Sequence, residues 1–270
     1  RLRQLMATKS PSRRAAAAPA AVAAPGVHYR VECADLHARL FEVTLTIDRP
    51  AAERQLSLPV WIPGSYLVRE FAKNLQGLQA SQGRRKAPVL TQLDKCSWRV
   101  ECAAGQPLVL RYKVCAYDNS VRTAWLDAER GFFNGTSLCL RVEGQTDAPH
   151  ALEIVAPAAS ALPEGAAPWS CATALPPLKT DRHGFGRYLA ADYDELADSP
   201  VELGAFWSGE FEAGGVPHRF VVAGAAASFD GERLLADTKA ICEAEMRFWH
   251  GDKVGKRGGA KPPIDRYVFM

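Results

Sequence analysis

The sequence predicts a mainly β protein, built as an antiparallel β-sandwich or a saddle-like sheet. Several short segments alternate apolar and polar residues with a period of two, which is typical of strands with one buried face. Short turns join these segments and favour antiparallel pairing. Only residues 230–250 carry apolar residues at the spacing of a convincing amphipathic helix.

Residues 1–26 are a basic tail rich in Ala and Pro. Pro11, Pro19 and Pro25 interrupt any helix, and almost no large apolar side chain is available for burial, so we expect disorder. The basic start followed by Ala15–Ala24 has the outline of a secretory signal, but alanine with prolines makes a poor apolar centre. We therefore expect a cytoplasmic protein, with export as the alternative. No run of about 18 apolar residues occurs, so we expect no membrane partner.

Residues 27–156 are predicted to form an N-terminal β domain. Its best turn signal is Asn134-Gly135, because these residues readily adopt the positive φ angles of a type I′ hairpin. The predicted strands are residues 40–47, 55–60, 97–102, 108–115, 137–142 and 151–155.

A second unit is predicted after a change in composition. Residues 157–185 are dominated by Ala and Pro without periodicity, and we interpret them as a surface connection. Residues 186–270 then form the second unit. Its first predicted strands are residues 186–190, 201–206 and 218–223.

The predicted helix at 230–250 has signals at both ends. Ser228 or Asp230 can cap its start, and Gly251 ends it. A strand pattern at Tyr267–Met270 runs to the last residue, which indicates a fragment of a longer chain.

The charge pattern argues against a nucleic-acid partner. The net charge is +3, but residues 1–30 contain six basic and no acidic residues, so the remainder is slightly acidic. The basic clusters of the remainder, at 84–86 and 253–261, lie in segments with Gly or Pro that we interpret as solvated loops.

Motifs for metals, nucleophiles and phosphates are missing from the sequence. The seven cysteines include no Cys-x-x-Cys pair and the six histidines no pair at i and i+4, so we predict no metal and no bound cofactor in this chain. Reduced thiols are the expected state of the cysteines. Gly-x-Ser-x-Gly and Gly-Lys-Ser/Thr do not occur.

The first of two informative motifs consists of Trp61, Pro63, Gly64, Tyr66 and Arg69. In a structural interpretation it is a corner in which Trp61 and Tyr66 bury their rings. Arg69 then pairs with an acid such as Asp118 or Asp127. In a functional interpretation the motif is the rim of a substrate cleft.

The second motif is the segment Tyr117–Thr136, in which charged residues precede the Asn-Gly turn. We expect these charges to pair within one loop and to hold the hairpin in a fixed direction, because they alternate in sign. They are Asp118, Arg122, Asp127, Glu129 and Arg130.

Together the two motifs resemble the N-terminal β domain of the glycyl aminopeptidases that carry a PDZ domain, a family of zinc metallopeptidases. The resemblance covers nearly everything after Val27. It implies that residues 186–270 are the α+β start of a thermolysin-like metallopeptidase domain. In this family a His-Glu-x-x-His helix and a further glutamate hold the zinc, and that motif is absent from this sequence.

The resemblance implies a zinc-dependent aminopeptidase whose peptide substrates have a small N-terminal residue such as glycine. Zinc belongs to the complete enzyme, and this chain, which lacks catalytic residues, is expected to be inactive alone. Asn134, Gly135 and Thr136 are the candidates for the substrate pocket, because the resemblance aims this hairpin at the active site. The alternative is a free-standing β-sandwich that binds a partner and is complete at Met270.

Overall fold

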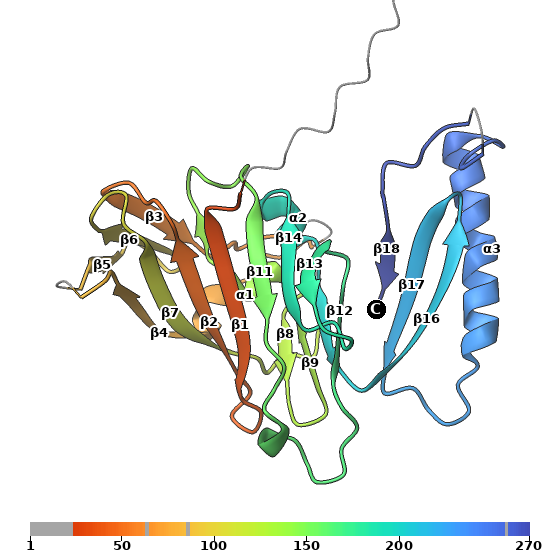
Figure 1. The fold of residues 1–270 in the computed structure, drawn as a ribbon, viewed down its shortest axis with the longest axis horizontal. Coiled ribbons are helices and arrows are strands. Elements are labelled where there is room, and N and C mark those ends of the chain that lie inside the picture. The colour runs from red at the N-terminus through yellow and green to blue at the C-terminus, as the bar shows by residue number, and fades with distance from the viewer. Residues whose placement is uncertain (1–23, 63–64, 85–86, 257–258) are drawn as a thin grey trace, which may run out of the picture.

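The computed structural model describes residues 24–62, 65–84, 87–256 and 259–270. Strands dominate these residues, so the predicted mainly β class is confirmed (Figure 1). Pro63 and Gly64 of the first motif lie outside the described residues, as does most of the N-terminal tail, whose expected disorder stays a prediction.

The largest sheet has seven strands in the order β13-β14-β11-β1-β2-β7-β4. β1 and β11 are parallel, and the other neighbouring strands are antiparallel. The period of two in the central strands matches their burial, because every second side chain of β2 is buried against the core. The strands are β13 (Pro177–Thr180), β14 (Gly186–Ala190), β11 (His150–Ile154), β1 (Val27–Asp35), β2 (Leu40–Ile47), β7 (Leu108–Cys115) and β4 (Leu75–Ser81).

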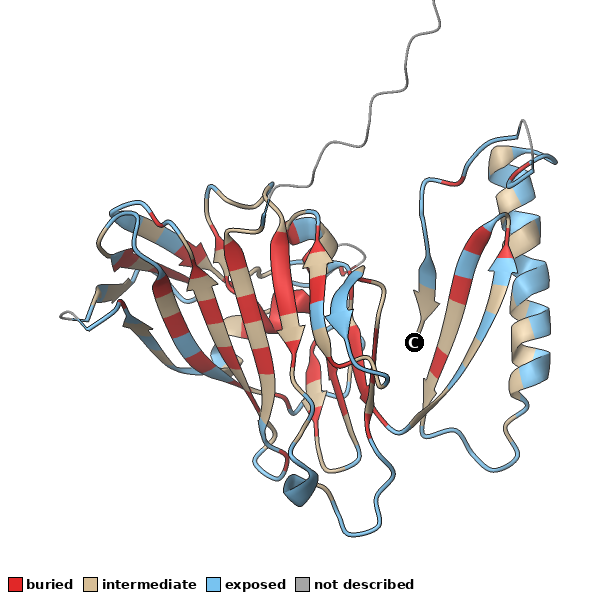
Figure 2. Ribbon diagram, in the orientation of Figure 1, coloured by how far each residue is buried: buried red, intermediate tan, exposed pale blue. Residues whose placement is uncertain are grey.

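Two four-stranded sheets complete a β body around one apolar core (Figure 2). Phe41 of the large sheet meets Phe133 edge-on, with 5.4 Å between ring centroids. The first small sheet contains β10 (Arg141–Val142), β3 (Glu53–Ser57), β6 (Ser97–Glu101) and β5 (Val89–Gln92). The second contains β12 (Ser170–Thr173), β15 (Val201–Gly204), β9 (Arg130–Phe133) and β8 (Ala124–Leu126).

The C-terminal unit is a three-stranded sheet with one long helix, drawn in blue in Figure 1. Helix α3 (Gly231–His250) packs on β16. Asp230 caps its start by accepting a hydrogen bond from the Arg233 amide, and Gly251 caps its end. The helix prediction is therefore confirmed, together with Asp230 as its cap. The strands are β16 (Phe206–Ala213), β17 (Val216–Ala223) and β18 (Tyr267–Phe269).

The segment 157–185, interpreted from its composition as a surface connection, contributes strands to the sheets and is partly buried. The segment contains a short 3-10 helix, η2 (Ala159–Ala161), and the strands β12 and β13, which pair with β15 and β14. β14 and β15 in turn pair with β11 and β9, so the sheets of the β body continue to Gly204 rather than ending near residue 156. The sequence did not predict these strands because neither buries every second residue: the two central residues of β12 are buried, and all four residues of β13 are exposed.

The type I′ hairpin expected at Asn134-Gly135 is also wrong. Asn134 has extended backbone angles, and Gly135 begins the short helix α1 (Gly135–Leu138), so the strand predicted at 137–142 is reduced to β10. Glycine is needed at 135 for close packing instead of a positive φ. A β-carbon there would lie 2.6 Å from the carbonyl oxygen of Leu196 in α2 (Tyr193–Ala197).

Candidate functional site

Three buried tyrosines hold the segment that follows α1. Carbonyl groups at the end of a helix have no partner within the helix, and here the carbonyls of Leu138, the last residue of α1, and of the two residues after it each accept a hydrogen bond from a tyrosine hydroxyl. Burial raises the pKa of each hydroxyl well above its ordinary value, so all three remain protonated donors. The bonds are Tyr112 to Leu138 at 2.6 Å, Tyr193 to Cys139 at 2.8 Å and Tyr29 to Leu140 at 2.7 Å.

The tyrosines come from three different elements, β1, β7 and α2. The hydroxyl of Tyr112 also accepts a hydrogen bond from the Leu140 amide at 3.2 Å. Because this tyrosine clamp ties the end of α1 to the seven-stranded sheet and to α2, α1 has one fixed position inside the β body.

The pocket candidates Asn134, Gly135 and Thr136 lie together on α1 and at its start, but they are buried. The Asn134 side chain donates to the carbonyl of Val121 at 2.6 Å, which fastens the loop of the second motif to α1. Thr136 is 4% exposed, and its hydroxyl finds no hydrogen-bond partner among the described residues. Direct contact between Thr136 and a substrate stays a prediction, one that this buried position does not support.

The charged residues of the second motif pair differently from the expectation. Arg130 forms a two-pronged ion pair with Glu202 of β15, at 3.0 and 2.8 Å, rather than with an acid of its own loop. Its third nitrogen donates to Asn119 at 3.2 Å. Burial raises the pKa of the Glu202 carboxyl, and the hydrogen bonds from Arg130 oppose that rise. Asp118 and Arg122 are exposed and form no ion pair with any described residue.

Asp127 organises the turn between β8 and β9. It accepts hydrogen bonds from the amides of Glu129 and Arg130 at 2.8 and 2.9 Å and from the Trp125 ring nitrogen at 2.9 Å. Burial acts to raise the pKa of its carboxyl, but these hydrogen bonds outweigh burial and lower it. Sequence reasoning missed Arg39, whose guanidinium lies 4.1 Å from the centre of the Trp125 ring.

The described residues of the first motif expose their aromatic side chains, so the buried corner of the structural interpretation is wrong. Trp61 is 55% exposed and Tyr66 is fully exposed. Arg69 donates to the hydroxyl of Ser65 at 3.0 Å, and neither Asp118 nor Asp127 is its partner. The loop leads into the 3-10 helix η1 (Phe71–Asn74), which packs beside α1, so both motifs are fastened to α1.

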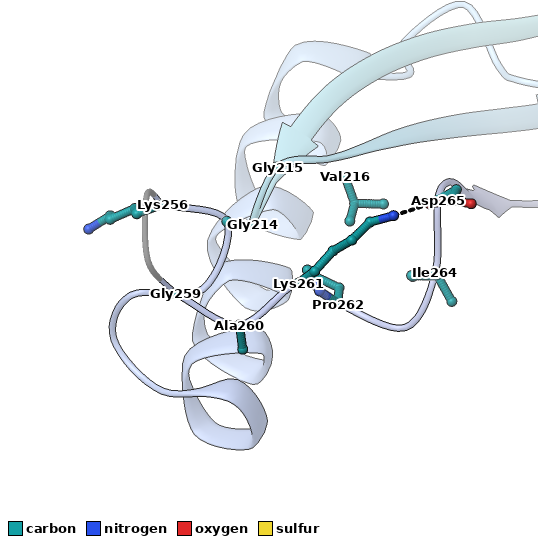
Figure 3. Close-up of a pocket in the computed structure, with 11 residues that line it drawn as sticks. Gly214, Gly215, Val216, Lys256, Gly259, Ala260, Lys261, Pro262, Ile264 and Asp265 are labelled. Atoms are coloured by element: carbon teal, nitrogen blue, oxygen red, sulfur yellow. Dashed lines mark hydrogen bonds and ion pairs between the residues drawn. The ribbon is translucent and has the colours of Figure 1, made fainter. Parts of the chain in front are cut away.

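The C-terminal unit contains a cavity of about 260 Å³ between the β16–β17 turn and the loop before β18 (Figure 3). Glycines form much of its wall. Lys261 crosses toward Asp265 and pairs with it at 2.9 Å, while Lys256 points away. Asp265 therefore partners Lys261 within the unit, and the described residues of the cavity wall bring no catalytic group together.

Two further properties of the described ranges concern cofactors and membranes. Within them, no three His, Cys, Asp or Glu side chains gather into a group able to hold a metal ion. The described helices include none that is both long and apolar enough to cross a membrane.

The architecture is similar to that of a solved relative. The solved structure of the aminopeptidase N family protein from Idiomarina loihiensis is 38% identical, with a TM-score of 0.79. The match covers 90% of this chain but only 38% of that one. An M1 zinc metallopeptidase mutant from Deinococcus radiodurans is 16% identical with a TM-score of 0.45, covering 90% of this chain and 54% of that chain. A search of curated proteins gives no match. Residues 28–205 match the Peptidase M61 N-terminal domain, so this chain belongs to that family.

Proposed function

We propose that this chain forms the N-terminal β domain, and the start of the catalytic domain, of a zinc-dependent aminopeptidase that acts on peptides with a small N-terminal residue such as glycine. The observation that carries the proposal is the likeness to the Idiomarina loihiensis protein, which is 38% identical over 90% of this chain. Family membership supports the peptidase class. The glycine preference rests on the motif resemblance.

The site suggests how the β body contributes. The tyrosine clamp and the contact between Gly135 and Leu196 fix α1, and α1 in turn carries the loops of both motifs. In the proposed enzyme α1 supports these loops and orients them toward the substrate. Following the motif resemblance, the proposal assigns the zinc and the glutamate that activates water to the catalytic domain of the complete enzyme.

A chimera tests the proposal. This chain replaces the equivalent part of the Idiomarina loihiensis protein, and hydrolysis of glycyl and leucyl p-nitroanilides is measured with and without a chelator. We expect zinc-dependent hydrolysis with the higher kcat/KM on the glycyl substrate, and none from the 270-residue chain alone. An inactive chimera, beside a parent that is active in the same assay, would contradict the proposal.

Thr136→Val distinguishes a supporting role of Thr136 in α1 from direct contact with the substrate. Valine keeps the shape of threonine and removes a hydroxyl that lacks a partner, so stability should stay equal or rise. If Thr136 only supports the loops, the variant chimera keeps the kcat/KM of the unmodified chimera. A tenfold loss at unchanged melting temperature, about 1.4 kcal/mol of transition-state binding, would place the hydroxyl against the substrate.

The second candidate function is a free-standing β-sandwich that binds a partner. The exposed Trp61 and Tyr66 favour it, because exposed aromatic side chains mark interaction sites. It predicts that the chimera is inactive while the isolated chain binds its partner.

A further inference from the structure

The C-terminal unit, residues 206–270, has almost no apolar core of its own. The large core cluster of the protein consists of residues between Val27 and Leu203 and includes no described residue of this unit. Helix α3 has no buried residue along its 20 positions. A sheet and a helix are stable only when their apolar sides are covered, so this unit leaves apolar surface open. Its buried residues, within the described ranges, are Ala213, Val216, His218, Val221, Val254 and Pro262.

The open surface is the aromatic face of the three-stranded sheet, which we define by the rings of Phe211, His218, Phe220, Tyr267 and Phe269. In the strand register His218 lies opposite both Phe211 and Tyr267, and Phe220 lies opposite Phe269, so all five side chains point to one side. The rings of Phe211 and His218 stack with 4.9 Å between centroids, and those of Phe220 and Phe269 with 4.7 Å. His218 alone is buried; the other four rings are partly exposed, and Tyr267 is 46% exposed.

Helix α3 covers the aromatic face only along β16. A β-carbon at Gly209 would lie 2.7 Å from Leu235 of α3, so α3 lies on the side of β16 to which Gly209 and, two residues on, Phe211 point. Figure 1 shows α3 next to β16, with β17 and β18 farther from it. A helix is about 10 Å wide and neighbouring strands lie about 4.8 Å apart. One helix on the edge strand β16 therefore leaves β18 and the adjacent side of β17 open.

The strand pairing favours a helix as the cover. β17 and β18 run parallel, and parallel strands are found with helices packed on their faces, because the connections between such strands cross over the sheet. The aromatic face consists of rings, so the side of the helix that covers it must be apolar. A second helix beside α3, with about 8–10 Å between the two axes, would lie over β17 and β18.

The covering helix has a source in the proposed enzyme. The Idiomarina loihiensis structure matches 90% of this chain with only 38% of its own length, so most of that longer chain lies outside the match. In the proposed enzyme the polypeptide continues from β18, which carries two of the five rings. A segment tethered this close reaches the face at a high effective concentration, whereas a second copy of the chain must associate from solution.

We infer that the aromatic face over β17 and β18 is the docking surface of an amphipathic helix from the remainder of the longer enzyme, packed beside α3. The inference rests on the proposed function for the existence of that remainder. It adds which face of this chain is covered, by what kind of element and against which residues.

Hydrogen exchange measured by mass spectrometry tests whether the face lacks a cover in this chain. In the 270-residue chain the amides of α3, β17 and β18 should exchange at least about tenfold faster than those of β2 and β7, because an unsupported unit opens locally. In the chimera with the Idiomarina loihiensis protein, exchange in the same three elements should slow by a similar factor. Equal exchange of both units in the isolated chain, or no slowing in a chimera whose β2 and β7 are protected, would overturn the inference.

Photo-cross-linking identifies the occupant. Tyr267→p-benzoylphenylalanine places a photoreactive ring on the aromatic face at a partly exposed position, and the residues it captures in the chimera are mapped by mass spectrometry. We expect cross-links to apolar residues of the remainder that lie three or four positions apart, as on one side of a helix. Captured residues two positions apart would indicate a strand, and cross-links between two copies would indicate self-association; either result would overturn the inference.

Leu93 supplies a matched control. It is 45% exposed and follows β5, which lies on the side of the β body away from the C-terminal unit (Figure 1). Leu93→p-benzoylphenylalanine should give no cross-link to the remainder, and equal yields from the two positions would refute specific docking.

Hydrolysis of glycyl p-nitroanilide separates the two proposals. An active chimera whose Tyr267 variant gives no cross-link refutes only the docking of a helix on the aromatic face. An inactive chimera with the expected cross-links refutes only the proposed activity.

Discussion

Tyr112→Phe should be the most damaging of the three possible hydroxyl deletions in the tyrosine clamp. The hydroxyl of Tyr112 satisfies two buried backbone groups, since it donates to Leu138 and accepts from the amide of Leu140. Those of Tyr29 and Tyr193 satisfy one carbonyl each. Phenylalanine preserves the ring and removes only the hydroxyl, so the loss reports on these hydrogen bonds.

The magnitude follows from the number of groups left without a partner. A buried backbone group that loses its partner costs about 1–3 kcal/mol. Tyr29→Phe and Tyr193→Phe should each cost this much, and Tyr112→Phe about twice as much. For a domain of this size, 1 kcal/mol lowers the melting temperature by about 2–4 °C.

Urea unfolding followed by circular dichroism, with the wild-type m-value as a check, measures the three losses in free energy. A water molecule that entered beside Leu138 would restore the lost bonds and reduce the penalty. The reasoning is refuted if Tyr112→Phe costs no more than the other two variants, or if all three cost under about 0.5 kcal/mol.

Three further predictions concern the same body. Gly135→Ala should lower the free energy of unfolding by about 1–3 kcal/mol, because its β-carbon meets a backbone carbonyl. Gly26→Ala, where the added β-carbon meets nothing, should leave the melting temperature unchanged. Equal effects of the two variants in thermal melts would contradict this. Arg130→Met should lower the free energy of unfolding, measured with urea, by about 3–5 kcal/mol, because it leaves the carboxylate of Glu202 buried and unpaired. Glu202→Gln should lower it less. The reverse order would be inconsistent with the ion pair. Burial lowers the pKa of His150, so near pH 6.5 the unfolded chain binds a proton that the folded chain does not bind. The free energy of unfolding should therefore fall below that pH, by up to about 1.4 kcal/mol per pH unit relative to His150→Asn. A constant difference between the two proteins from pH 8 to pH 5 would contradict this.

The sequence predicts strands well where one face is buried and the other meets solvent. β2 and β7 alternate strictly, and their predicted bounds match the structure. β13 is exposed along its whole length, shows no alternation in sequence and was missed. β15 is buried along its whole length, but Val201, Glu202 and Leu203 alternate apolar and polar residues, so the sequence pattern predicts this strand while misplacing the Glu202 side chain in solvent.

The tyrosine clamp and the Arg130–Glu202 pair lay beyond prediction because they join residues far apart in the chain. Arg130 and Glu202 are separated by 72 positions, and β9 and β15 bring them together only when the sheet assembles. Local signals could do no more than flag Glu202 as a lone acid within an apolar segment. Its buried position shows that a single charge among apolar residues indicates a paired partner elsewhere.

The two misjudged turns have one physical cause. Asn-Gly favours a hairpin by a local backbone preference, but packing against α2 and the hydrogen bonds of the tyrosine clamp together outweigh that preference at residues 134–135. In the first motif the usual order of burial is reversed, since Ser65 is buried while Tyr66 is exposed. A serine is kept inside because its hydroxyl and carbonyl complete the frame of the loop, and the tyrosine is left outside by the same frame. Burial at these residues follows hydrogen bonding rather than the size or apolarity of the side chain, and a pattern of apolar residues in the sequence carries no signal of that.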